Sequence, residues 1–208
     1  MIKFLISKIK VLKKLNIPFL LYFSSKYNYK LYNNKILYNK TYYNLKLKFI
    51  RYICYNYCIT YKQYLYYINK IRKNYKYVIY FKLLNILESR LDVFLVNIGC
   101  FKTILQSRYY IKSQNIYINN INIKYYNINI KNNDIIFFNS KIKYIILKNL
   151  IYKYNIYLYI FKLYKYNFIK IYSYNENFIL CIYNLKIKIV NNILLNNILY
   201  IYNNFFYI

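Results

Sequence analysis

Apolar residues recur at helical spacing through much of the first half of the chain. Between Tyr42 and Leu87, apolar and aromatic side chains recur every three or four residues with Lys and Arg between them, a pattern that predicts helices. From Leu91 to Ile98 the same spacing predicts a further short helix. Gly99, the only glycine of the chain, follows it. We expect Gly99 to end this helix, because glycine adopts a left-handed conformation without a Cβ clash.

A second short helix is predicted to begin at Thr103, shortly after the turn at Gly99. Thr103 and Gln106 have the spacing of a capping box, in which both side chains satisfy free backbone N–H groups at the start of a helix. We therefore expect two short helices joined by a tight turn.

After this helix the apolar period changes from helical to alternating, which is typical of strands. We expect three short strands joined by polar turns: Ile116–Ile118, Ile121–Tyr125 and Ile135–Phe138. The first turn is Asn119-Asn120, where Asn stands in for the usual Gly because it tolerates a positive φ better than most residues. The second turn is the polar stretch from Lys131 to Asp134.

Residues 1–40 are basic and irregular in pattern, and we predict that they form an arm lying on RNA. The stretch from Met1 to Leu21 mixes Lys with Ile and Leu, and it is too charged for a membrane-spanning helix. It also lacks the Arg and Ser richness of a transit peptide and the small-residue cleavage site of a signal peptide.

Two later stretches carry weaker patterns. The segment from Tyr144 to Tyr174 is aromatic and basic, and the alternation from Tyr152 to Tyr159 predicts strands in its middle. Tyrosines beside lysines in this segment either stack on nucleic-acid bases or stand in place of other large residues without a binding role. From Leu185 to Ile208, Asn pairs lie opposite apolar residues at helical intervals. An amphipathic helix on a protein core is favoured over a membrane span, because unpaired amides are costly in lipid.

The charge of the chain is strongly one-sided. Its 208 residues include 33 Lys and Arg but 4 Asp and Glu, which gives a formal net charge of +29. Such a charge opposes compaction unless a polyanion is near. We therefore expect a nucleic-acid partner, with an anionic membrane surface as the alternative. The dominant residues Ile, Asn, Lys and Tyr have A/T-rich codons, which indicates an A/T-rich genome such as that of an organelle.

The composition argues against enzymatic chemistry and against a cofactor. The chain has no His, and its acids are Glu88, Asp92, Asp134 and Glu176. Because general acid–base catalysis usually recruits His or carboxylates, we do not expect an enzyme. A single Gly excludes a Gly-rich phosphate loop. Without His partners, the cysteines (Cys54, Cys58, Cys100 and Cys181) are predicted to be buried thiols and not a metal site or disulfides.

The order of elements over residues 88–138 resembles the RNA-binding domain named after ribosomal protein S-four. The resemblance is carried by Arg90-Leu91-Asp92, the Gly99 turn, Lys102-Thr103, Arg108, Ile116 to Asn120 and Asn133 to Ile136. The chain departs from the family at three positions. Ile104 stands where the family usually has Arg, Gln114 where it usually has Lys, and Asn120 where it has the hairpin Gly.

The resemblance implies an α+β fold. A basic arm (residues 1–40) would precede a helical domain (residues 41–87 plus 184–208), into which an RNA-binding domain (residues 88–183, motif core 88–138) is inserted. Two short helices on a small antiparallel sheet would make up that inserted domain.

The resemblance also implies a structural protein of the small ribosomal subunit. It would bind the 5′ domain of the small-subunit rRNA, contact neighbouring ribosomal proteins and aid assembly and translation, with no small-molecule substrate and no membrane. The ribosome would be that of a plastid of the apicoplast type, or alternatively of a mitochondrion. The alternative functions are a basic amphipathic membrane-surface protein and a stand-alone RNA chaperone with the same domain.

The resemblance places eight residues near RNA: Arg90, Lys102, Thr103, Arg108, Lys112 and Gln114 in the motif, and Lys48 and Arg51 in the preceding helical segment. Two of them have alternative roles. Arg90 could equally form an ion pair with Glu88 or Asp92, and Thr103 could act only as a helix cap. We expect Arg108→Glu to weaken rRNA binding by about 2 kcal/mol or more.

Overall fold

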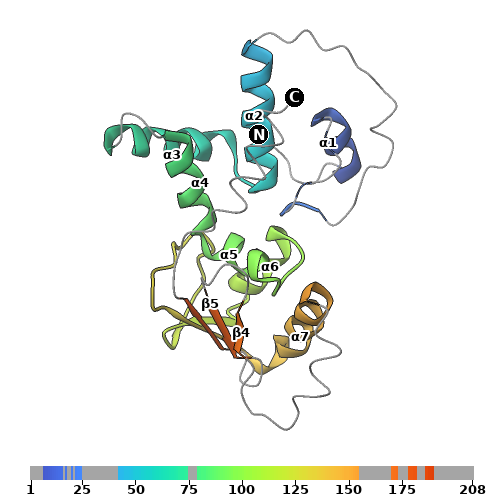
Figure 1. Ribbon diagram of the computed structural model, residues 1–208, viewed down its shortest axis with the longest axis vertical. Coiled ribbons are helices and arrows are strands. Elements are labelled where there is room, and N and C mark those ends of the chain that lie inside the picture. Colours follow the sequence, from blue (N-terminus) through green and yellow to red (C-terminus); the bar gives the residue numbers. More distant parts are fainter. Residues whose placement is uncertain are drawn as a thin grey trace.

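The structure is a computed structural model of an α+β protein (Figure 1). It describes residues 7–15, 17, 20, 22–24, 42–74, 79–154, 170–172, 178–181 and 186–189. In the view of Figure 1 the described helices and strands form an upper helical part and a lower part that contains the sheet. The coarse prediction of mixed helices and a small antiparallel sheet is confirmed.

The upper part is helical. Its helices are α1 (Lys8–Leu15), α2 (Tyr42–Asn56), α3 (Tyr61–Asn74) and α4 (Ile79–Glu88). The helices predicted between Tyr42 and Leu87 are therefore confirmed. Thr60 and Gln63 start α3 with a reciprocal capping box, because the Gln63 N–H donates to Thr60 Oγ1 (3.3 Å) and the Thr60 N–H donates to Gln63 Oε1 (2.9 Å).

The lower part contains α5 (Leu91–Ile98), α6 (Ile104–Lys112) and α7 (Ser140–Tyr154) together with the sheet. Gly99 ends α5 with φ +100°, as predicted. The Thr103 side chain accepts from the Gln106 N–H at 3.3 Å, and Gln106 Oε1 accepts from the Lys102 N–H at 3.1 Å. The cap predicted at Thr103 is confirmed, with the reciprocal bond one residue earlier than in the standard box.

One antiparallel sheet joins the described strands in the order β2-β1-β3-β6-β5-β4. The strands are β1 (Ile116–Ile118), β2 (Ile121–Asn122), β3 (Ile135–Phe138), β4 (Lys170–Tyr172), β5 (Phe178–Cys181) and β6 (Lys186–Ile189). The hairpin between β1 and β2 turns at Asn119 (φ 49°) and Asn120 (φ 67°). Two successive positive φ values match the twist of a tight hairpin, so the predicted turn is confirmed.

The second predicted strand is shorter than expected, since β2 ends at Asn122 and not at Tyr125. The reason is that the chain leaves the hairpin to pair elsewhere. The Leu91 N–H donates to the Ile128 carbonyl (2.9 Å), and the Ile130 N–H donates to the Ser89 carbonyl (2.9 Å). These bonds tie the segment after the hairpin to the start of α5.

The helix predicted from Leu185 onward is wrong at Lys186–Ile189, which form β6 between β3 and β5. Ile187 and Ile189 are buried, whereas Lys186 and Lys188 are exposed. This alternation of period two is that of a strand with one buried face. These four residues therefore belong to the sheet and not to the helical domain, and residues 190–208 of the predicted helix lie outside the described residues.

Two further predictions need correction. The arm predicted as irregular contains α1, whose Val11, Leu12 and Leu15 are buried in the core. Their spacing places them on one side of a helix, which gives the helix an apolar contact face. The strand predicted over residues 152–159 is also wrong for residues 152–154, because these three residues form the end of α7. Residues 155–159 lie outside the described part of the chain.

Candidate nucleic-acid interface

The charged side chains at the junction between the upper and lower parts are buried. Arg90 is 2% exposed and bonds to both carboxylate oxygens of Asp92, from Nε to Oδ1 (3.2 Å) and from Nη2 to Oδ2 (2.7 Å). The alternative role of Arg90, an ion pair with an acid, is thus the one observed, and Asp92 is the partner. The fold encloses the guanidinium of Arg90, so this side chain offers RNA little exposed surface, and its placement near RNA stays a prediction.

Arg108 joins the two parts of the molecule. Its Nε donates to Asp92 Oδ2 at 2.7 Å, and its two terminal nitrogens donate to the carbonyls of Cys58 (2.9 Å) and Tyr57 (3.1 Å). Its side chain is 13% exposed. These bonds connect α6 with the end of α2. Arg108 thus has a structural role, whereas its predicted contact with RNA stays a prediction. Arg108→Glu would place a second carboxylate against Asp92.

Glu88 forms a second buried polar centre beside the first. Its carboxylate accepts from the hydroxyls of Tyr22 (3.0 and 3.1 Å) and Tyr57 (2.5 Å) and from the Asn97 side-chain amide (2.6 Å). Burial, and then the negative charge of Glu88, raise the pKa of both tyrosines well above its usual value. These bonds connect the N-terminal segment, the end of α2 and helix α5.

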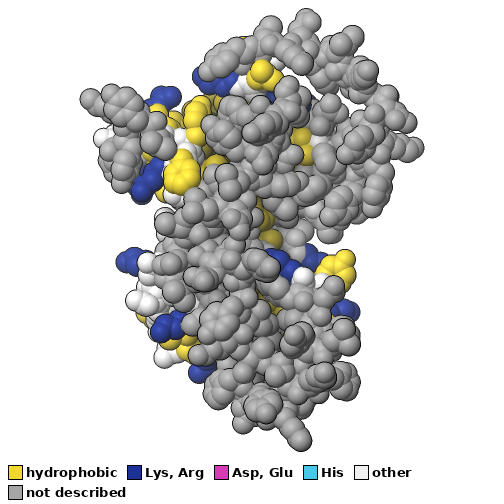
Figure 2. Space-filling view, viewed as in Figure 1, with side chains coloured by type: hydrophobic (Ala, Val, Ile, Leu, Met, Phe, Trp, Pro, Cys, Tyr) yellow, Lys and Arg dark blue, Asp and Glu magenta, His cyan; other side chains and the backbone are white. Residues whose placement is uncertain are grey.

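Asp134 is also used within the fold. Oδ1 accepts from the Asn119 amide at 2.9 Å, and Oδ2 accepts from the Lys131 backbone N–H at 2.8 Å. The three acids of the described chain are thus all bonded to protein groups. Figure 2 accordingly shows dark blue Lys and Arg side chains and no magenta carboxylates among the described residues of that face. The exposed charge that the described residues contribute to that face is positive.

Lys102 and Lys112 lie at opposite ends of α6, and both are exposed. The Lys102 ammonium is 5.7 Å from the centre of the Tyr152 ring, and the Lys112 ammonium is 5.7 Å from the centre of the Tyr126 ring. The Tyr126 ring is also 4.6 Å from the Arg108 guanidinium. Aromatic rings attract cations through their electron-rich faces, so the Tyr126 ring attracts both Lys112 and Arg108.

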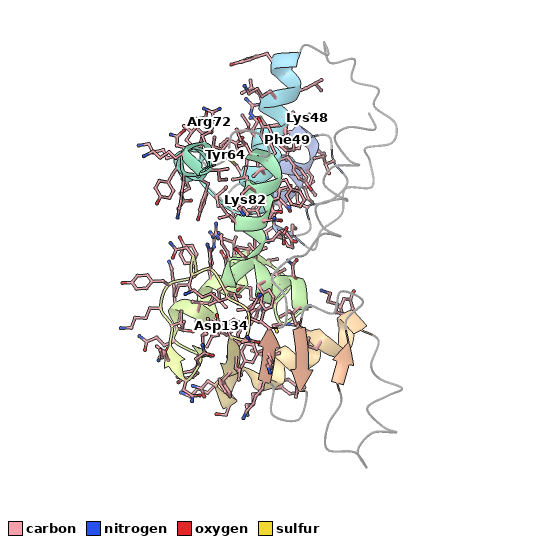
Figure 3. All side chains as sticks on the ribbon, turned by 60° about the vertical axis from the view of Figure 1, so that its left-hand side comes forward. Lys48, Phe49, Tyr64, Arg72, Lys82 and Asp134 are labelled. Atoms are coloured by element: carbon pink, nitrogen blue, oxygen red, sulfur yellow. The ribbon has the colours of Figure 1, made fainter. Side chains whose placement is uncertain are left out.

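The other predicted site residues have different surroundings. Thr103 caps α6, and Gln114, at φ 58°, accepts from the Asn122 amide at 3.3 Å. Figure 3 shows Lys48 on α2, in the upper part and away from Asp134 in the lower part. Burial lowers the pKa of Lys48, whereas Arg51 is exposed and lines a pocket of about 220 Å³ between α1, α2 and the start of α3. The structure therefore does not bring the α2 residues to the surface of α6.

Sequence reasoning missed two exposed tyrosines, one on α6 and one in the segment after the hairpin. Tyr109, on α6, is 68% exposed, and Tyr125, after the hairpin, is 72% exposed. The signal was available for Tyr109, because Ile104, Ser107 and Ile111 form the buried side of α6 and leave Tyr109 on the other side. The exposed lysines and tyrosines on or next to α6 and in the segment after the hairpin are called the α6 surface below: Lys102, Tyr109, Lys112, Lys124 and Tyr125.

The cysteines with described side chains do not form a metal site. Cys54, Cys58 and Cys100 are buried, and within the described residues no three or more His, Cys, Asp or Glu side chains are grouped to hold an ion. Burial raises the pKa of the Cys54 thiol to about 11 and those of Cys58 and Cys100 to about 12. These three thiols are therefore neutral at physiological pH and serve as small apolar core groups.

The comparisons with protein-family models and with curated proteins give no match for this chain. No protein-family model matches it, and no curated protein shows significant similarity to it. In the described part of the chain, no helix combines the length and the apolar character needed to cross a membrane.

Proposed function

We propose that this protein is a structural component of the small ribosomal subunit, related to the S-four family, and that it binds the 5′ domain of the small-subunit rRNA. The observation that supports this most is the combination of the α5–turn–α6 unit and hairpin with an exposed surface whose charges are all cationic. The unit has the element order of the family's RNA-binding domain. The α6 surface presents Lys102, Lys112 and Lys124, while Glu88 and Asp92 are bonded in the interior and Asp134 is bonded within a surface turn.

In the proposed architecture the sheet-containing part is inserted into the helical part. The chain passes from α4 directly into α5, and β6 brings it back into the sheet beside β3. Residues 190–208, which lie outside the described part of the chain, stay assigned to the helical domain in this proposal. Because Lys186–Ile189 form β6, we propose that the inserted domain extends through Ile189 instead of ending at residue 183.

Binding would depend mainly on charge and shape. Lysines of the α6 surface would neutralise phosphates and release condensed counterions, which makes affinity fall steeply with salt. Tyr109 and Tyr125 offer exposed rings on which unpaired bases can stack. Little reading of base sequence is expected, because proteins recognise folded RNA largely through its shape and backbone. Subunit assembly and translation would be aided by holding this rRNA domain in its folded form.

The supposed location is an organellar ribosome, of a plastid of the apicoplast type or of a mitochondrion. This expectation rests on composition. Ile, Asn, Lys and Tyr, whose codons are rich in A and T, dominate the chain. Fractionation of the organelles, followed by detection of this chain in their small subunits, distinguishes the two locations.

The proposal is tested by titrating the 5′-domain rRNA with the full chain and with a variant carrying Lys102→Glu and Lys112→Glu. Two reversed charges on the α6 surface should weaken binding by about tenfold or more at moderate salt. The matched control carries Lys141→Glu and Lys148→Glu, which reverse two exposed lysines of α7. Equal losses in both variants would show that only net charge matters, and would contradict an interface at α6.

The rival functions give different results. A membrane-surface protein would float with anionic vesicles and bind the rRNA no better than any polyanion at matched salt. A stand-alone RNA chaperone would bind the rRNA but leave intact small subunits during a high-salt wash. The proposed ribosomal protein stays with the subunits through that wash.

A further inference from the structure

The outward side of α3 carries a second cationic surface, distant from α6 in the fold (Figure 1). Tyr64, Ile68 and Ile71 form the inward side of this helix and are buried in the core. The outward side carries Lys62, Tyr66, Lys70 and Lys73, all exposed. In Figure 3, Tyr64 lies on the inner side of α3 and Arg72 on its outer side.

The four outward residues form one stripe, called the α3 stripe below. With 100° between successive residues, a regular helix places these positions within an arc of about 80°. A rise of 1.5 Å per residue separates the Cα atoms of Lys62 and Lys73 by about 16 Å along the axis. Tyr66 lies between these two lysines and is 63% exposed. An exposed ring is thus flanked by cations on both sides along the helix.

The stripe is not arranged to stabilise the helix. The sequence of α3 contains no acidic residue, so no i,i+4 pair of opposite charges can form within it. Lys62 lies in the first turn, where the helix dipole disfavours a cation. Lys70 and Lys73 repel each other at a spacing of three residues. An anionic partner would offset each of these costs.

The chemistry of the stripe favours nucleic acid over a membrane. A helix that lies in a membrane surface needs a continuous apolar side to insert among the lipids, and the continuous apolar side of α3 is already buried against the protein core. The exposed apolar residues Tyr61, Leu65 and Tyr66 alternate with cations instead. In Figure 2, dark blue and yellow side chains lie side by side over this helix. Interleaved rings and cations are the surface that single-stranded nucleic acid binds.

We propose that the α3 stripe binds a single-stranded segment of RNA, with one base stacked on Tyr66 and the neighbouring phosphates paired with Lys62, Lys70 and Lys73. This inference rests on the proposed function, since it assigns a second contact with the same class of partner. The two surfaces lie on different parts of the molecule (Figure 1), so they contact different segments of a folded RNA.

The test uses the full chain and a labelled single-stranded RNA of about 12 nucleotides, within the usual site size of such surfaces. The salt dependence of its dissociation constant is measured for a variant carrying Lys62→Gln, Lys70→Gln and Lys73→Gln. Loss of three phosphate contacts should reduce the slope of log K against log salt by about 2. The matched control carries Lys131→Gln, Lys141→Gln and Lys148→Gln, which remove the same charge at exposed positions elsewhere and should change the slope less.

Substitutions at Tyr66 test the stacked base. Tyr66→Ala should weaken binding by about fivefold or more, whereas Tyr66→Phe, which keeps the ring, should bind as the wild type does. Equal losses for Tyr66→Ala and Tyr66→Phe, or equal slopes for the α3 triple variant and its control, would overturn the proposal. The proposal would also be overturned if the α3 variants lost binding to anionic vesicles or to an acidic protein but kept binding to the RNA.

The two proposals fail in distinguishable ways. If the 5′-domain rRNA is not bound specifically but the α3 variants still reduce binding of the short RNA, the ribosomal function fails and the α3 site stands. If the α6 variants weaken rRNA binding but the α3 variants bind both the rRNA and the short RNA as the wild type does, the α3 site is contradicted and the ribosomal function stands. Melting curves of each variant, followed by circular dichroism, confirm that these exposed substitutions leave the fold intact.

Discussion

The arginines at the junction and the lysines of the α6 surface carry the same charge in opposite settings. Arg90 and Arg108 are enclosed and bonded to Asp92, whereas Lys102 and Lys112 are exposed at the ends of α6. Among the described residues, the two arginines that pair with Asp92 therefore have structural roles, and the exposed lysines of α6 remain available for a partner. The planar guanidinium suits the buried pairs because it forms several directed hydrogen bonds at once, and the ammonium suits an exposed phosphate contact.

The largest predicted effect comes from removing the acid at the junction. Asp92→Asn leaves Arg90 and Arg108 buried without a counter-charge, which should lower the free energy of unfolding by about 3–5 kcal/mol. Urea denaturation measures this loss. Asp134→Asn is the control, because its carboxylate serves a surface turn and its loss should cost about 1 kcal/mol. Similar losses in the two variants would show that the junction is not held by its ion pairs.

A second effect concerns the other buried centre and appears at alkaline pH. The pKa of Tyr57 is raised well above its usual value of 10.0 in the folded protein. Above pH 10 the unfolded chain therefore loses a proton that the folded chain keeps, so this contribution to stability is complete below pH 10 and is lost as the pH rises. The loss is about 1.4 kcal/mol per pH unit for one such group.

The contribution of Tyr57 is isolated by comparing the wild type with Tyr57→Phe. From pH 10 upward the stability of the wild type should fall more steeply than that of the variant, by the amount expected for one proton. Urea denaturation at a series of alkaline pH values measures both slopes. Parallel curves would mean that the Tyr57 hydroxyl titrates in the folded protein as it does in water.

Gly99→Ala should destabilise the protein by about 2 kcal/mol, because it combines an unfavourable φ with a steric clash. Gly99 has φ +100°, and an added Cβ would overlap the side chain of Lys153. Thermal melting measures the loss. The double variant Gly99→Ala with Lys153→Ala removes the clash but keeps the φ penalty, although it also removes the bond from the Lys153 ammonium to the Asn97 carbonyl. No loss in the single variant would contradict the turn geometry.

The smallest predicted effect, that of Thr103→Ala, tests whether Thr103 has a structural role or a role in RNA binding. Thr103→Ala removes the cap of α6 and should cost about 1 kcal/mol of stability, without changing rRNA affinity in the folded protein. A titration well below the melting temperature separates the two. A fall in affinity with unchanged stability would instead assign Thr103 to the binding surface.

The local elements between Glu88 and Phe138 were predictable from sequence because each has a strong local signal. Gly99 permits the left-handed turn, Thr103 caps the next helix, and an Asn pair turns the hairpin. β6 was missed because its Ile187 and Ile189 lie inside a longer apolar stretch where helical and alternating patterns overlap. Partners distant in the sequence decide such cases, and here β3 and β5 supply them.

The candidate site was predictable only in part, for a physical reason. A motif that contains Arg90 and Arg108 does not show which acids will lie beside them in space. Asp92 is close to Arg90 in sequence, so their ion pair was among the alternatives considered. In the sequence, Arg108 is far from Asp92 and farther still from Tyr57 and Cys58, although it is bonded to all three in the fold. The bonds to the Tyr57 and Cys58 carbonyls exist only after the two parts of the molecule have packed together.

The most direct test of the account is the density for this chain in small ribosomal subunits purified through a high-salt wash. We expect the chain to remain bound, with Lys102 and Lys112 of the α6 surface against the 5′ domain of the rRNA and with Arg90 and Arg108 bonded to Asp92. Absence of the chain from washed subunits, or an α6 surface turned away from RNA, would contradict it.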